Sequence, residues 1–124
     1  MSGKMHELDA AHHGAQLHLD EQSAPEIKAM IAELIADRDS RGWQHDLKNL
    51  AMGLNVEAGE VLDIYTWKDT GESLSDAEAA HTAEELADVL IYVFDMCAKL
   101  NLDPLKIMRA KQAINATRHR GAKA

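Results

Sequence analysis

The stretch NVEAGEVLDIYTW, residues 55–67, decides the fold because it places two glutamates three residues apart in an otherwise apolar, helix-forming run. Residues at this spacing are neighbours on one face of an α-helix. Glu57 and Glu60 therefore flank the apolar stripe, whereas Asp63 falls on the opposite face. The run predicts an amphipathic helix over about 46–67 that carries two acids at the edge of its buried face.

A second acidic pair follows downstream in EELADVLIY, residues 84–92. Glu85 and Asp88 lie on one strip of a second expected helix, and Tyr92 continues that strip. This helix extends to about residue 100 and is apolar almost all round, which predicts a central helix covered on several sides. We expect it to pack against the helix over 46–67.

Packing these two helices together would bring four carboxylates close to one another. Like charges at such spacings repel, and partial burial raises the cost of keeping them ionised. A bound divalent cation would remove that cost. Oxygen donors alone suit Mg²⁺, Mn²⁺ or Ca²⁺ better than zinc or copper, and a di-iron bundle would normally show Glu-x-x-His pairs.

Capping signals predict two further helices. Ser23 and Glu26 form a candidate capping box for a helix that ends near Gly42. Asp103 is expected to cap a helix that begins at Pro104 and runs to about residue 118. The helix that contains the second acidic pair has two candidate capping boxes, Ser75 with Glu78 and Thr82 with Glu85.

The predicted fold is therefore all-α, a four-helix bundle, with the helical domain over residues 23–118. Residues 1–22 show no clear period and are expected to form a flexible, histidine-containing arm, and residues 119–124 a frayed basic tail. Because the helix over about 76–100 is apolar almost all round, we expect another copy of the chain to cover part of it in a homo-oligomer.

Composition excludes several classes of function. The chain has 124 residues, enough for one domain, and its net charge of −8 argues against nucleic-acid binding through a basic surface. It contains no apolar run long enough to span a membrane and no signal-peptide pattern, so we expect a cytoplasmic protein without membrane association. Its single cysteine, Cys97, is expected to be a small buried hydrophobic residue.

The acidic pattern by itself leaves alternatives open. Glu-x-x-Glu is common on solvated helix faces, and two such pairs on adjacent helices are stronger support for a metal site than either pair alone. Phosphate chemistry is one use of such a site. A non-catalytic helical module that binds a structural ion or a partner helix is another.

The two motifs also carry a resemblance to a known family. EAGE at residues 57–60, followed after 24 residues by ELAD at 85–88, resembles the signature of the MazG-like all-α nucleotide pyrophosphohydrolases. The longer strings EAGEVLDIYTWK and EELADVLIYV look most like the dCTP pyrophosphatase branch, and the likeness covers about residues 26–120.

This resemblance implies Mg²⁺-dependent hydrolysis of a nucleoside triphosphate to the monophosphate and pyrophosphate, with Mn²⁺ as a substitute ion. It favours dCTP or a modified dCTP as substrate and a role in cleaning the nucleotide pool. It also implies that the homo-oligomer is a tetramer ahead of a dimer. The alternatives are a phosphoribosyl-ATP pyrophosphohydrolase, which uses the same metal scheme, a dimeric dUTPase-type relative, and the non-catalytic module.

The resemblance also implies roles for particular residues. The chain departs from the family pattern in three places. Leu47 stands where proline is usual in the HDLKN segment, the stretch between Trp43 and His45 is shorter and lacks an expected phenylalanine, and His119 replaces an aromatic residue. These departures concern recognition of the base rather than binding of metal. The implied metal-binding and catalytic residues are Glu57, Glu60, Glu85 and Asp88, and the implied substrate-binding residues are Trp43, His45, Lys48, Asn49, Trp67, Tyr92, Lys111, Asn115 and Arg118.

Overall fold

The structure is a computed structural model of the chain, and it describes residues 7–8, 14–42 and 46–122. The described ranges contain no β-strand, so the all-α prediction is confirmed. A short 3-10 helix precedes four α-helices: η1 (Gly14–Leu17), α1 (Pro25–Ser40), α2 (Leu47–Tyr65), α3 (Asp76–Lys99) and α4 (Pro104–Ala122).

Local capping fixes where two of these helices begin. The Asp46 side chain accepts a hydrogen bond from the backbone N–H of Asn49 at 2.7 Å and caps α2. Ser75 and Glu78 form a complete capping box at the start of α3, which selects the first of the two expected boxes. The helix α4 continues to Ala122, beyond the expected end near residue 118, because residues 119–122 contain no proline to stop it.

The predicted cap of α1 is wrong. The N-cap position is occupied by Ala24, and no side chain caps this helix. Ser23 is buried, and its Oγ instead accepts a hydrogen bond from the backbone N–H of Asp20 at 3.0 Å. Gly42 does follow the end of α1 as expected, with a φ of 70° that suits glycine.

Ser23 contributes to a buried polar cluster at the start of α4. Burial acts to raise the pKa of Asp103, but hydrogen bonds from Ser23 and from the backbone N–H groups of Lys106 and Leu105 hold that pKa below its ordinary value. Asp103 is only 1% exposed, so these bonds satisfy a carboxylate that water cannot reach. The expected cap of α4 is thus confirmed.

The segment before α1 is attached to the turn between α3 and α4. The backbone N–H of Leu19 donates to the carbonyl of Asn101 at 3.2 Å, and that of Asp103 donates to the carbonyl of Leu17 at 2.9 Å. Lys106 Nζ donates to the carbonyl of His18 at 2.9 Å. These contacts belong to part of the segment expected as a flexible arm, and the division of the chain at residue 23 stays a prediction.

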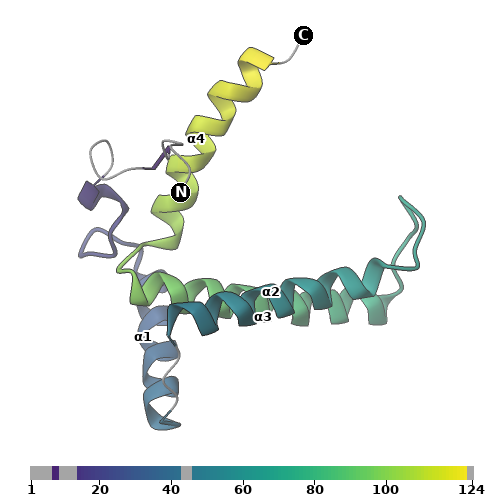
Figure 1. Cartoon of the computed structure of the whole chain (residues 1–124), viewed down its shortest axis with the longest axis horizontal. Helices are drawn as coiled ribbons and strands as arrows, with labels where there is room; N and C mark the ends of the chain where they lie inside the picture. Colours follow the sequence, from purple (N-terminus) through teal and green to yellow (C-terminus); the bar gives the residue numbers. More distant parts are fainter. Residues whose placement is uncertain (1–6, 9–13, 43–45, 123–124) are drawn as a thin grey trace.

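The helices form an open arrangement (Figure 1). Antiparallel α2 and α3 lie side by side along their lengths, and α1 packs across α3 near one end of the pair. The helix α4 leaves the pair from that same end and projects to the other side. At the far end, the Tyr65 hydroxyl and Thr82 Oγ1 are 3.0 Å apart and join the two long helices by a hydrogen bond.

This arrangement leaves much apolar surface uncovered. Among the described residues, the fully buried hydrophobic side chains are Ile31, Leu50 and Cys97, so the expected burial of the cysteine is confirmed. Leu90 of α3 remains 54% exposed, and Leu62 of α2 remains 66% exposed. The chain exposes 9297 Å², whereas a compact monomer of its mass would expose about 6,600 Å².

Within the ranges that the structure describes, none of the helices combines the length and the apolar character that a bilayer-crossing segment requires.

Replacing Ser75 with alanine should destabilise the chain. The substitution removes the side-chain oxygen that accepts from the Glu78 backbone N–H at 3.1 Å, and loss of such a cap costs about 1 kcal/mol. Urea denaturation followed by circular dichroism, at one fixed protein concentration, would measure it. Ser73→Ala, in the exposed loop before the cap, is the matched control. Equal unfolding midpoints for the two variants would contradict a role of the cap in stability.

Candidate functional site

Three carboxylates converge where α2 packs against α3. Glu57 lies in the middle of α2, and Glu85 and Asp88 lie one turn apart in α3. One oxygen from each of these side chains lies within 4.8 Å of the others. We call Glu57, Glu85 and Asp88 the acidic triad. It arises because antiparallel packing places the two motifs, which are distant in the sequence, at the same level of the helix pair.

Two oxygens of the acidic triad are buried and have no hydrogen-bond partner in the structure, Oε2 of Glu57 and Oε2 of Glu85. Asp88, in contrast, is exposed, so the triad is open to solvent on one side. Buried oxygens without a partner are uncommon and costly. A set of carboxylate oxygens at this separation fits a hard divalent cation, which would satisfy both atoms.

Glu60 lies beside the acidic triad, outside the group of three convergent oxygens. Burial raises the pKa of the Glu57 carboxyl above its ordinary value, and the charges of Glu60, Asp88 and Glu85 add to this shift. A hydrogen bond with Glu60 raises the pKa of Glu85, and burial adds to it. The folded chain therefore favours protonation of Glu57 and Glu85 when no cation is bound.

His81 is a neighbour of the site that the sequence reading did not include. Its Nε2 lies 3.2 Å from Oε1 of Glu85, one helical turn further along α3. The side chain is 56% exposed, but its ring reaches the carboxylate. The spacing of four residues was the signal that could have found it.

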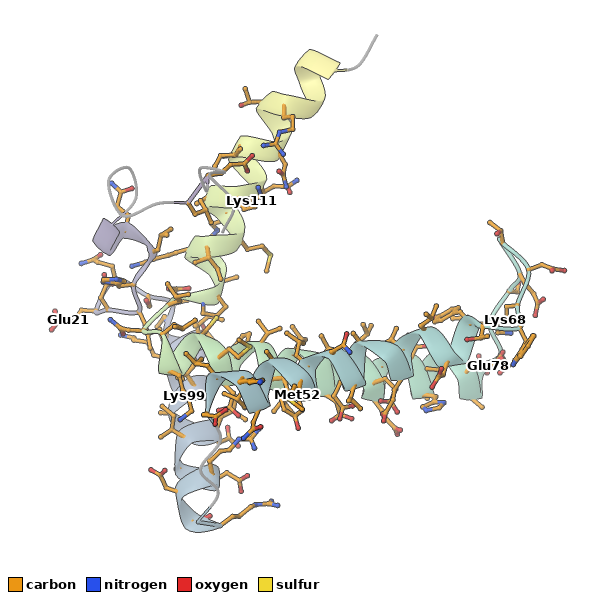
Figure 2. All side chains as sticks on the ribbon, viewed as in Figure 1. Glu21, Met52, Lys68, Glu78, Lys99 and Lys111 are labelled. Atoms are coloured by element: carbon orange, nitrogen blue, oxygen red, sulfur yellow. The ribbon has the colours of Figure 1, made fainter. Side chains whose placement is uncertain are left out.

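The cationic residues of α4 lie apart from the acidic triad. Figure 2 shows Lys111 on the part of α4 that has left the α2–α3 pair. Lys111 and Arg118 both form ion pairs with Glu7 of the N-terminal segment. Across the described residues, no hydrogen bond or ion pair joins either cation to the acidic triad or to Glu60.

An open cavity of 480 Å³ adjoins Lys111. Lys111 and Asn115 contribute polar groups to its wall, and Leu8 contributes an apolar side chain. Phe94 lies on its α3 side. The two polar residues, which the sequence placed among the substrate contacts, therefore share one surface, between α3 and α4.

The aromatic candidates differ in their surroundings. Tyr92 is half-buried, with its ring against the backbone of Gly53 and the guanidinium of Arg38 at 5.8 Å from the ring centre. Arg38 also forms an ion pair with Asp95, which is buried and structural. Trp67 is 94% exposed just beyond the end of α2, so it has almost no packing role within this chain.

The remaining candidates lie near the start of α2. Lys48 and Asn49 are exposed in its first turn, where Asn49 takes part in capping through its backbone N–H. Trp43 and His45 lie outside the described residues.

The chain is similar to curated pyrophosphatases. It is 36% identical over 106 residues to human dCTP pyrophosphatase 1, an alignment that covers 80% of this chain and 60% of the human protein. It is 32% identical over 117 residues to dCTP pyrophosphatase 1 of Rattus norvegicus, covering 90% of this chain and 67% of the rat protein. The chain thus spans about three fifths to two thirds of the length of these relatives.

A solved structure supports the same relationship. A pyrophosphatase from Archaeoglobus fulgidus matches with a TM-score of 0.65 and 29% sequence identity, and the match covers 81% of this chain and 97% of that one. No family model matches the sequence.

The stability of the metal-free protein should fall as the pH rises above the ordinary glutamate value. Because the folded-state pKa values of Glu57 and Glu85 are raised above 4.5, the folded chain binds more protons than the unfolded chain between 4.5 and those raised values. Stability then decreases through this window. Glu78, whose pKa is lowered to about 2, opposes this trend near pH 4.5 and contributes a constant amount only once the unfolded chain is fully ionised, above about pH 6.

Thermal melting in EDTA from about pH 5 to about pH 7 would measure this slope. A Glu57→Gln, Glu85→Gln double variant should lose it, and added Mg²⁺ should reduce it in the unaltered protein. A melting temperature that rises with pH in EDTA would contradict the arrangement of the carboxylates.

Proposed function

We propose that the activity of this chain is the hydrolysis of a nucleoside triphosphate to the monophosphate and pyrophosphate, since the chain belongs to the all-α nucleotide pyrophosphohydrolases and, within them, to the dCTP pyrophosphatase branch. The observation that carries this proposal is the acidic triad with its two buried, unpartnered oxygens. A protein without a cation to bind would gain nothing from this costly arrangement.

The acidic triad and Glu60 would hold Mg²⁺, or Mn²⁺ in its place. Such an ion supplies charge neutralisation for the triphosphate and a bound water of lowered pKa. The net charge of −8 makes this neutralisation necessary, because the bare acidic cluster would repel an anionic substrate.

The carboxylates also have a role in proton transfer. Attack of a water oxygen on phosphorus breaks the anhydride bond between the α- and β-phosphates, pyrophosphate leaves, and the water proton must be accepted. Glu60 is the candidate acceptor, because it lies beside the acidic triad rather than among its convergent oxygens. Its carboxylate lies beside those of Glu57 and Glu85 and would therefore be next to the bound water.

Lys111 and Arg118 would bind the phosphate chain. Their ion pairs with Glu7 indicate that the two side chains can reach one anion together. A triphosphate would displace the Glu7 carboxylate, since it offers more negative charge and more acceptor oxygens to the same donors. Asn115, which lines the same cavity, would hydrogen-bond the nucleotide.

The aromatic residues would hold the base. The Trp67 ring is exposed on both faces and available for stacking, and Tyr92 continues the strip of Glu85 and Asp88. Trp43, His45, Lys48 and Asn49 enter this proposal by resemblance alone. The preferred substrate is dCTP or a modified dCTP, the role is cleaning of the nucleotide pool, and the location is the cytoplasm.

A homo-oligomer, tetramer or dimer, would complete the site. The exposed area exceeds that of a compact monomer by about 2,700 Å², which is within the range that obligate interfaces bury. Among the residues that the structure describes, the α4 cations pair with Glu7, and no hydrogen bond or ion pair joins them to the acidic triad. We therefore propose that α4 of one copy lies against the acidic triad of another.

Release of pyrophosphate from a panel of triphosphates with Mg²⁺ tests the function. Turnover of dCTP or a modified dCTP ahead of other nucleotides supports it. Release from phosphoribosyl-ATP alone would favour that activity instead, and release from none, with helicity intact, would favour a non-catalytic module.

Replacing Glu60 with glutamine should lower the rate of metal-dependent turnover by roughly 100-fold or more, because it removes a carboxylate that binds metal or accepts the proton. The fold should be as stable as before or slightly more stable, since one repelling charge is lost. Steady-state pyrophosphate release and thermal melting measure the two effects. Glu84→Gln, on the same helix as Glu85, is the control. A fully active Glu60→Gln enzyme would refute the assignment.

Mixing two inactive variants should restore activity if the site is shared between copies. Glu60→Gln chains lack a competent acidic cluster, and Lys111→Ala chains lack a phosphate clamp. Unfolding and refolding them together in equal amounts should restore roughly one quarter of the wild-type rate in a dimer. No recovery, with a multimeric mass in light scattering, would place both halves of the site in one copy. A monomeric mass would remove the oligomer altogether.

A further inference from the structure

We propose that His81 is a positioning residue for Glu85, which holds one oxygen of this carboxylate so that the other faces Glu57 and Asp88. The proposal rests on the cation site described above. It assigns His81 no direct contact with metal or substrate.

The contact itself requires a donor on the ring. Nε2 of His81 and Oε1 of Glu85 are 3.2 Å apart. An ionised carboxylate only accepts hydrogen bonds, so His81 must carry a hydrogen on Nε2 to make this bond. Both residues lie on α3 at a spacing of four, and the rigid helix therefore sets the direction from which the ring approaches.

The two oxygens of Glu85 have different surroundings. Oε1 meets His81, whereas Oε2 is buried and has no hydrogen-bond partner. The terminal torsion of glutamate is broad, so rotamer preference alone would not fix this orientation. A hydrogen bond to one oxygen restricts that rotation and keeps the other oxygen available to a cation.

The surroundings make such a restraint necessary. Glu85 lies beside the carboxylates of Glu57 and Glu60, which repel it when ionised, and close to that of Asp88. His81 is the basic side chain that hydrogen-bonds this group within the described part of the chain. Groups that hydrogen-bond a metal ligand commonly change metal affinity when they are removed, by about 10- to 100-fold.

A merely structural role would have a different signature. The His81 side chain is 56% exposed, and an exposed pair of this kind on a helix adds little to stability. Removing it should therefore leave the fold intact. Its effect should be visible in the affinity for cation, which a structural pair would not alter.

Titration of the full-length chain with Mn²⁺, followed by the electron paramagnetic resonance signal of the free ion, tests the proposal without nucleotide. His81→Ala should weaken binding by about tenfold, and its melting temperature in EDTA should equal that of the wild type. His81→Gln keeps an N–H donor and should recover most of the affinity. His18→Ala, at an exposed histidine on another segment, should bind Mn²⁺ as the wild type does.

Two results would overturn the inference. Unchanged Mn²⁺ affinity in His81→Ala would show that Glu85 needs no partner. Equal losses in His81→Ala and His81→Gln would show that the hydrogen bond is not the cause. If the wild type binds no Mn²⁺, the proposed cation site itself fails, and that outcome is distinct from the other two because it precedes any comparison of variants.

Discussion

Repulsion among carboxylates held between two packed helices is the constraint on which the candidate site depends. Glu57, Glu85 and Asp88 are brought together by the antiparallel contact of α2 and α3, and Glu60 adds a fourth negative charge beside them. Folding must therefore oppose this repulsion or relieve it. Protonation relieves it in part, and the raised pKa values of Glu57 and Glu85 express that tendency. A divalent cation would relieve the repulsion without protonation of the acids.

The open shape of the chain separates two chemical tasks. The α2–α3 pair carries the acidic groups, and α4 carries the cations at Lys111 and Arg118 (Figure 1). Placing both groups in one compact bundle would let them neutralise one another without substrate. Because the carboxylates lie on α2 and α3 and the cations lie on α4, the cations could exchange Glu7 for another anion. The exposed apolar side chains of Leu90 and Leu62 offer surface to a second copy, which in the proposed oligomer would bring its α4 to the α2–α3 pair.

The surroundings of the site are more ordered than its exposed position suggests. Tyr92 is held between α1 and α2, because the Arg38 guanidinium covers its ring and Gly53 leaves room beside it. His81 reaches Glu85 from the solvent side of α3. These contacts come from three different helices, so the geometry of the carboxylates depends on the packing of all of them. Even a half-exposed site therefore has a defined shape.

The sequence by itself determined the features that depend on neighbours along the chain. The periods of apolar residues predicted the helices, and Ser75 and Asp103 predicted where two of them begin. The spacing of Glu57 and Glu60 predicted that they share one face. These follow from the 3.6-residue turn, which is a local property. The resemblance of the two acidic motifs predicted the family, and the similarity to human and rat dCTP pyrophosphatase 1 confirms it.

Only the tertiary structure decided which groups meet. Ser23 turned from the expected cap of α1 to the buried Asp103, and Lys111 and Arg118 met Glu7, more than a hundred residues before them. Three of the four acids converged, and His81 joined one of them. The physical reason is that the distance between side chains on different helices depends on how those helices pack and diverge. No local periodicity contains that information.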